Sequence, residues 1–109
     1  QLKKVIKALN DLKLKDIIVY DFRTYSPLFD YMVIASGSSE RQVLASIRHL
    51  TDALPDTPIK VEGASEGRWL LFDLSDIIVN VMHQDERDYY QLDKLFFQRD
   101  TVNIEELGL

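Results

Sequence analysis

The segment DYMVIASGSSERQV, residues 30–43, most constrains what this chain can fold into. Residues 30–36 are apolar on both faces of an extended chain, which predicts a strand buried on both sides of a sheet. Gly37 then allows a tight turn, and Ser39 followed by Gln42 is a capping-box pattern that begins a helix. A strand buried on both sides needs neighbouring strands and covering helices, so the segment favours a layered α/β or α+β domain.

The rest of the chain supplies these neighbours. Apolar residues at helical spacing predict helices at 2–14, at 39–54 and from 85 to 96, the last with Tyr89, Leu92, Leu95 and Phe96 on one side. Runs of β-branched and aromatic residues predict strands at 16–22, 30–36, 59–62, 68–73 and 76–83. We therefore expect one domain over residues 1–109, with a mixed sheet of about five strands flanked by helices. The tail, 100–109, offers Ile104 and Leu107 for packing, and we expect it to be loosely held.

Composition narrows the possible partners. The chain has no cysteine, which excludes disulfides and thiolate metal sites. Its net charge of -5 disfavours a primary nucleic-acid binder, because such binding neutralises phosphates with Lys and Arg, and favours a basic protein partner. No apolar stretch approaches the roughly 20 residues of a membrane span, and no signal peptide is visible. We expect a cytoplasmic protein without direct nucleic-acid sequence recognition.

The turn Gly37-Ser38-Ser39 allows two interpretations. A helix N-terminus behind a glycine turn can hold a phosphate, so a nucleotide-binding or nucleotidyl-transfer enzyme is one hypothesis. Such an enzyme would also need metal-binding carboxylates about a helix further on, where the chain has Arg48, His49 and Leu50. The other interpretation is a capped helix after a tight turn, with no catalysis.

The histidines give no support to catalysis or metal binding. His49 and His83 are the two in the chain, far apart in sequence and without a second ligand at metal spacing. No nucleophile-elbow pattern accompanies the serines. We therefore predict no catalytic residues, no metal and no cofactor.

Trp69, in the strand GRWLLFD, is the main candidate for a binding residue. It is either a core residue or an interface residue, since tryptophan is common in both places. Trp69 and Leu71 should face one way and Leu70 and Phe72 the other. Asn80, inside an apolar strand, should be hydrogen-bonded or at a sheet edge. More aromatic residues than one short helix can bury follow at 89–97, which favours an exposed interface. We predict these partner-binding residues: Trp69, Leu70, Asp73, Asp76, Tyr90 and Lys94.

Four blocks together resemble the ribosomal silencing factor (Iojap) family. They are DYMVIASGSSERQV, VEG at 61–63, GRWLLFDLSDIIVNV at 67–81 and RDYYQLDKLF at 87–96, in the family's order and spacing. The resemblance runs from about residue 2 to residue 96. Met32 stands where the family usually has an aromatic residue, Asn80 where it often has His, and Phe96 where Trp is usual.

The resemblance implies a fold and a function. Such factors have a nucleotidyltransferase-like fold without the catalytic carboxylates. They bind the large ribosomal subunit through the basic ribosomal protein conventionally numbered fourteen (uL14), block joining of the small subunit and repress translation under nutrient limitation. They form homodimers when free. A non-enzymatic repressor is therefore our leading hypothesis, and the nucleotide enzyme is the alternative.

Overall fold

The computed structural model describes residues 1–63 and 66–107. It contains a five-stranded sheet with the order β1-β2-β5-β4-β3. The strands are β1 (Lys15–Asp21), β2 (Tyr31–Gly37), β3 (Lys60–Glu62), β4 (Trp69–Asp73) and β5 (Ile77–His83). The β2–β5 pair is parallel, and the other neighbours are antiparallel, so the sheet is mixed as predicted. No helix in the described part of the chain is long and apolar enough to cross a membrane.

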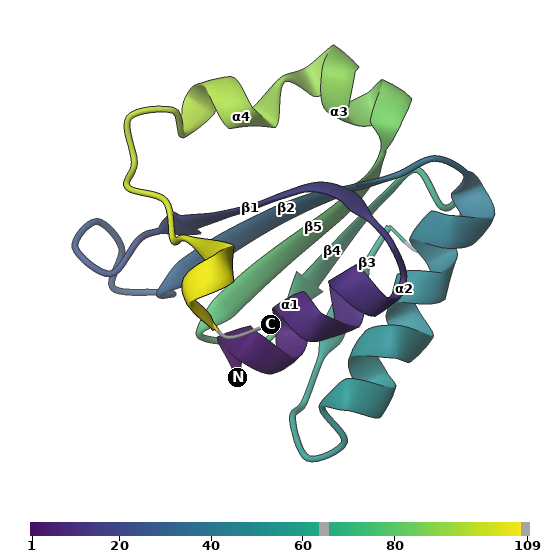
Figure 1. Cartoon of the computed structure of the whole chain (residues 1–109), viewed down its shortest axis with the longest axis horizontal. Helices are drawn as coiled ribbons and strands as arrows, with labels where there is room; N and C mark the ends of the chain where they lie inside the picture. Colours follow the sequence, from purple (N-terminus) through teal and green to yellow (C-terminus); the bar gives the residue numbers. More distant parts are fainter. Residues whose placement is uncertain (64–65, 108–109) are drawn as a thin grey trace.

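The doubly buried strand predicted from the sequence is β2, between β1 and β5. Its residues Val33, Ile34 and Ala35 have no exposed surface. The strand has helices on both sides of it, since α1 and α2 lie on one face of the sheet and α3 and α4 on the other (Figure 1). The sequence pattern therefore identified this interior strand, covered on both faces, correctly.

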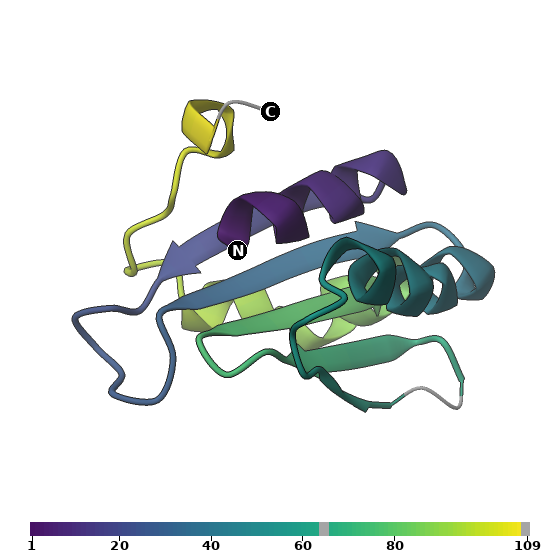
Figure 2. The same cartoon turned by 90° about the horizontal axis from the view of Figure 1, so that it is seen from below.

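Two helices cover the first face. Figure 2 shows α1 (Leu2–Asp11) over β1 and β2, and α2 (Glu40–Ala53) over β5 and β4. The apolar stripe of α1, including Val5, Ile6 and Leu9, is fully buried against this face, as are Leu50 of α2 and Phe72 of β4. We call it the covered face.

The start of α2 follows the predicted pattern. Ser39 is the N-cap, and its Oγ accepts a hydrogen bond from the Gln42 amide at 3.1 Å. A Cβ on Gly37 would lie 2.8 Å from Val43 Cγ2, so only glycine allows α2 to begin this close to β2.

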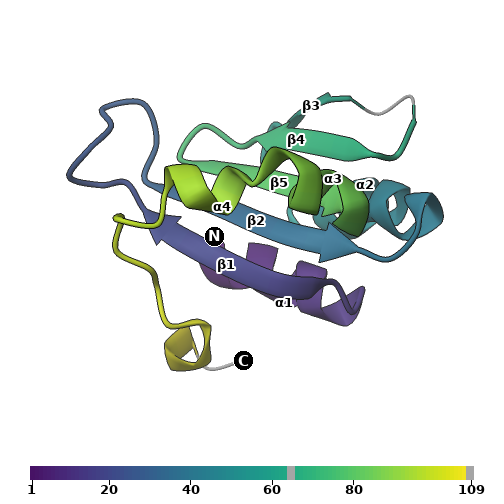
Figure 3. The same cartoon turned by 90° about the horizontal axis from the view of Figure 1, so that it is seen from above.

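The second face carries shorter helices than the sequence predicts. The segment after β5 forms α3 (Gln84–Tyr90) and α4 (Leu92–Leu95), which are separated by Gln91 in the left-handed conformation at φ 50°. Because the break turns the chain, the predicted single apolar side is wrong: Tyr89 and Leu95 are largely exposed, whereas Phe96 packs against the sheet. Figure 3 shows α3 and α4 across β2 and β5, with β4 and β3 to one side.

The tail packs along β1. Thr101 forms an isolated antiparallel bridge with Tyr20, and the Val102 amide donates to the Val19 carbonyl at 2.9 Å. The short helix η1 (Ile104–Leu107) then places Ile104 and Leu107 against the main core. Residues 100–107 are therefore held by backbone hydrogen bonds and apolar contacts, whereas the sequence suggested a loosely held segment.

Candidate partner-binding surface

The face of the sheet beside α3 is partly uncovered, and we call it the open face. Strand alternation places Trp69 and Leu71 of β4, Ile78 of β5 and Met32 of β2 on this side. All four are half-buried. A cleft of about 570 Å³ lies over Met32, Leu71 and Ile78 and is completed by residues of the β1–β2 loop and around the β4–β5 turn: Leu28, Phe29, Asp73, Ser75 and Asp76. Leu28 is 81% exposed, so this part of the surface is both apolar and accessible to solvent.

Trp69 is held in a fixed position on the open face. Its indole Nε1 donates to Asn80 Oδ1 at 2.9 Å, and its ring centroid lies 5.1 Å from that of Tyr90 on α3. The Asn80 amide also donates to Met32 Sδ at 2.9 Å, so this buried polar residue in central strand β5 is hydrogen-bonded, as predicted. Tyr90 in turn contacts Tyr89, which is 79% exposed. The indole is thus ordered before any partner arrives, which reduces the entropy cost of binding through it.

Acidic side chains lie at the far end of the same face. Trp69 pairs with Met82 and Asp73 pairs with Ile78, so the two β4 residues mark opposite ends of the strand. The Asp73 carboxylate accepts from the Ser75 amide at 2.9 Å and holds the β4–β5 turn. Asp76 has an exposed side chain, and its carbonyl accepts from the amide of Asp30, another exposed acid. The apolar cleft therefore ends in a group of carboxylates.

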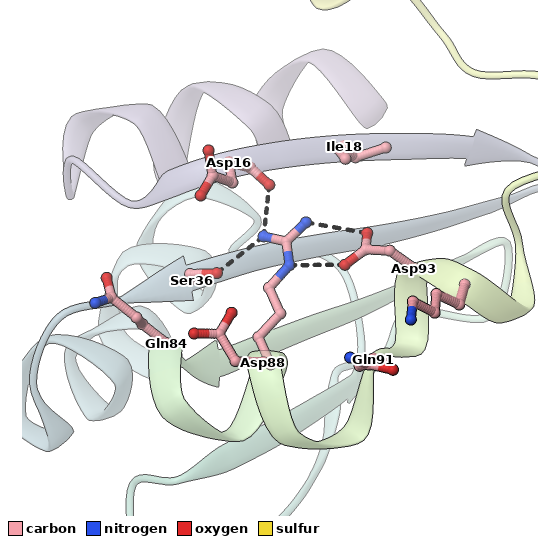
Figure 4. Close-up of a pocket in the computed structure, with 9 residues that line it drawn as sticks. Asp16, Ile18, Ser36, Gln84, Asp88, Gln91 and Asp93 are labelled. Atoms are coloured by element: carbon pink, nitrogen blue, oxygen red, sulfur yellow. Dashed lines mark hydrogen bonds and ion pairs between the residues drawn. The ribbon is translucent and has the colours of Figure 1, made fainter.

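A buried arginine fastens α3 and α4 to the sheet. Arg87 is 8% exposed. Its Nη1 donates to the Asp16 carbonyl at 2.6 Å and to Ser36 Oγ at 2.9 Å, and its Nε and Nη2 donate to the two Asp93 oxygens at 3.0 and 3.1 Å (Figure 4). Tyr20 donates its hydroxyl to Asp93 Oδ1 at 2.9 Å. One guanidinium thus joins β1, β2, α3 and α4.

This network changes the acidity of its members. Burial disfavours the charged form of Asp93, but the hydrogen bonds from Arg87 and Tyr20 outweigh burial and hold the pKa of the carboxyl below its usual value. Burial, with the hydrogen bond to Asp93, raises the pKa of Tyr20 to about 12. At neutral pH the ion pair is therefore intact and the phenol is protonated.

Four of the predicted contact residues share one surface, and two do not. Trp69 and Tyr90 touch, and Asp73 and Asp76 border the same face. Lys94 is exposed but lines a different cleft of about 750 Å³, together with Arg87, Asp16 and Ile18. Leu70 has no exposed surface, because it faces α1 and α2, so the prediction that it contacts a partner is wrong. For the five other residues, the role in binding stays a prediction.

The sequence reasoning missed several residues of the open face. Leu71 lies on the side of Trp69, as the alternation within GRWLLFD indicates, and should have been chosen in place of Leu70. Met32 and Ile78 have the same alternation signal in their own strands. Leu28 and Phe29 carry no such signal, because they lie in a loop whose course depends on the tertiary structure.

The glycine corner is filled by Gln42. The side-chain Oε1 of Gln42 accepts from the Ser38 amide at 2.7 Å and from Ser38 Oγ at 3.1 Å. Its Nε2 donates to the Leu12 carbonyl at 3.0 Å. Amides that would hold a phosphate are thus used within the chain. This arrangement favours the capped-helix interpretation of the turn.

Fold and surface together define a small α+β domain with an exposed aromatic and acidic surface, which is typical of a protein that binds another protein. The family model described as "Ribosomal silencing factor during starvation" matches residues 1–108. A ribosomal silencing factor of Bacillus subtilis is 41% identical over 98 residues, which cover 87% of this chain and 83% of that protein. The chain belongs to the ribosomal silencing factor family.

Two further relatives extend the comparison. A crystal structure of a protein from Chromobacterium violaceum superposes with a TM-score of 0.82 at 39% identity, over 87% of this chain and 82% of the other. A mouse protein named "Mitochondrial assembly of ribosomal large subunit protein 1" is 28% identical over 101 residues, which cover 87% of this chain and 44% of that protein. The solved relative supports the α+β architecture, and the mouse relative carries the large ribosomal subunit in its name.

Proposed function

We propose that this protein represses translation by binding the large ribosomal subunit through ribosomal protein fourteen and excluding the small subunit. Membership in the ribosomal silencing factor family supports a role at the ribosome, and the name of the mouse relative supports the large subunit. The mechanism needs no chemistry, because a folded domain on the joining surface excludes the other subunit by its volume alone. In this proposal the protein acts in the cytoplasm.

The open face is the observation that carries this proposal. Trp69 supplies an ordered aromatic side chain beside an apolar cleft, which is the kind of residue that dominates binding energy at protein interfaces. Asp73 and Asp76 add negative charge at the border of the cleft, and Asp30 lies next to them. A basic ribosomal protein would be attracted to such a surface and oriented on it.

Co-sedimentation tests the proposal directly. The protein should pellet with isolated large subunits and not with small subunits, and it should lower the light-scattering signal of subunit joining. Equal pelleting with both subunits, or with neither, contradicts the proposal. Binding to large subunits that leaves joining unchanged would support the docking part and refute the steric part.

We also propose that the free protein forms a homodimer through part of the open face. Exposed apolar surface of this kind tends to find a partner, and the half-buried residues around Trp69 would be shielded from water in a dimer. Light scattering at high micromolar concentration should give twice the mass of one chain. Added large subunits should then compete with the dimer, since both use the same residues. A monomer at that concentration refutes this part.

The alternative, a nucleotide enzyme, is disfavoured by the way Gln42 uses the Ser38 amide. We expect no change in melting temperature when nucleoside triphosphates and Mg²⁺ are added, and no nucleotide turnover. Turnover that disappears in Asp73→Asn or Asp76→Asn would overturn this expectation and make the enzyme the better hypothesis.

A further inference from the structure

The positive charge of this acidic chain is concentrated at one end. Residues 1–15 carry five of the seven lysines and one acidic residue, a net charge of +4. The other 94 residues carry eight cationic and 17 anionic side chains, which leaves -9. The overall charge of -5 thus conceals two regions of opposite sign.

The fold presents these lysines as one exposed surface. Val5, Ile6 and Leu9 fix the buried stripe of α1, so Lys3, Lys4 and Lys7 project from the outer side of the helix, and all three are exposed. Lys13 lies in the turn after α1 and Lys15 begins β1, and both are also exposed. Because β1 is an edge strand, the basic surface reaches from the helix to the rim of the sheet. We define the basic flank as these residues: Lys3, Lys4, Lys7, Lys13 and Lys15.

Most of the flank is free to meet an outside anion. Lys7 pairs with Asp11 at 2.9 Å. Within residues 1–63 and 66–107, no carboxylate lies within 4.0 Å of the ammonium groups of the other four lysines. In the same part of the chain most arginines are occupied: Arg23, Arg48, Arg68 and Arg87 pair with carboxylates, and Arg99 lies over Tyr25.

We propose that the basic flank contacts the phosphate backbone of the large-subunit ribosomal RNA, beside the protein to which the open face docks. This inference rests on the proposed function. A basic ribosomal protein in the large subunit is surrounded by anionic RNA. A binding partner that covers the ribosomal protein and reaches past its edge therefore meets both positive and negative charge. The acidic border of the open face and the basic flank, on α1, the turn after it and the start of β1, lie on separate parts of the domain, so one bound copy can meet both charges. Lysines on a helix and a turn bind phosphates without reading sequence.

Salt dependence of binding tests the inference. Each lysine that contacts a phosphate adds roughly 0.7–0.9 to the slope of log affinity against log salt concentration. Replacing Lys3, Lys4, Lys13 and Lys15 with Gln should therefore lower that slope by about 3. Between 50 and 200 mM salt, the wild type should lose roughly 50- to 150-fold more affinity for large subunits than this variant does. Gln keeps the helix propensity of Lys, so the variant should fold, and circular dichroism checks that it does.

Two single variants provide a matched comparison. Lys15 lies in edge strand β1 and Lys60 in edge strand β3, at opposite edges of the sheet, and both are exposed. Lys15→Gln should lower the salt slope by roughly 0.7–0.9, whereas Lys60→Gln should leave it unchanged. Equal effects of the two variants would mean that net charge alone matters, and would overturn the inference.

The outcomes separate this inference from the proposed function. If wild type binds large subunits and all lysine variants keep its salt slope, the basic flank makes no RNA contact and docking through the open face stands. If wild type does not bind large subunits, the proposed function fails. Filter binding of wild type and the quadruple variant to deproteinised large-subunit RNA at 50 mM salt then tests the basic flank alone. If the wild type retains RNA on the filter and the variant does not, the flank binds phosphate. If the wild type retains no RNA, or the variant retains as much, the inference is refuted.

Discussion

The two faces of the sheet are built from the same strands but are covered in different ways. On the covered face, helices of 10 and 14 residues leave Val5, Leu50 and Phe72 without exposed surface. On the open face, helices of seven and four residues leave Trp69 and Leu71 half-buried. The first face supplies stability, and the second leaves exposed the surface that we propose for recognition. Short, broken helices are thus a means of keeping part of a sheet accessible.

Neighbouring residues in β4 give the sharpest test of this comparison. Phe72→Ala should destabilise the domain by about 3–5 kcal/mol, because it removes a fully buried ring from the covered face. Leu71→Ala, one residue away on the open face, should cost about 1 kcal/mol. Urea unfolding measures both. Similar free energies of unfolding for the two variants would mean that the faces do not differ in this way.

Trp69→Ala should affect binding more than folding. We expect a loss of about 2–4 kcal/mol in binding to large subunits, roughly 30- to 1000-fold in affinity. The fold should lose about 1–2 kcal/mol, because Asn80 Oδ1 loses its donor. Leu44→Ala, an exposed leucine on α2, is the control and should bind normally. If circular dichroism shows the Trp69→Ala protein unfolded, Trp69 belongs to the core and the open face is misassigned.

Arg87→Ala should loosen the helices that border the open face. It leaves Asp93, the Asp16 carbonyl and Ser36 Oγ without their donor, at a cost of about 2–4 kcal/mol in unfolding free energy. The double variant Arg87→Met with Asp93→Leu removes both charges and should recover most of that loss. Urea titrations of the two variants make the comparison. If the double variant is no more stable than the single one, the guanidinium acts through packing and not through charge.

The same network predicts how stability depends on pH. The pKa of Tyr20 is raised from 10.0 to about 12, so the folded state holds this proton more tightly, and stability should fall between pH 10 and pH 12, by about 1–2 kcal/mol after solvent screening. The pKa of Asp93 is lowered, so its contribution is present above about pH 4 and is lost as pH falls further. Tyr20→Phe should remove the alkaline step in thermal melts, and an unchanged step would assign it to other groups.

Charge reversal at the border of the open face should have the smallest effect. Asp76→Lys should weaken binding to large subunits by about 0.5–1 kcal/mol at low salt and by less at high salt, because exposed charges are screened. Asp56→Lys makes the same change of charge at an exposed residue between α2 and β3, and should have no effect on binding. Equal weakening by both variants would show that net charge, and not the open face, attracts the subunit.

Local sequence signals account for most of the fold. All five strands and the α2 cap lie where β-branched runs, turns and the Ser39–Gln42 pair predicted them. The break at Gln91 was not predictable, since a left-handed residue other than glycine has no reliable local signal. The position of the tail depends on the pairing of Thr101 with Tyr20, residues far apart in the chain.

The candidate surface was predicted less completely. Trp69 was predicted as a contact residue because tryptophan is frequent at interfaces. The strand alternation that places Leu71 on the same face would also have predicted Leu71. Arg87 was missed, because it lies among other charged residues in QDERDYY, where the local pattern indicates a solvated helix. Its burial arises from four hydrogen bonds to three residues on β1, β2 and α4, brought together by tertiary folding alone.

The parallel pairing of β2 with β5 affects when the sheet can fold as the chain is synthesised. Gly37 ends β2, and its neighbour β5 begins at Ile77, after α2, β3 and β4 have been synthesised. Such distant pairing requires the closure of a long loop, so the centre of the sheet forms late. During synthesis from the N-terminus, a chain that lacks β5 has no Trp69–Asn80 hydrogen bond and no assembled open face. The open face can therefore form only after β5 has been synthesised.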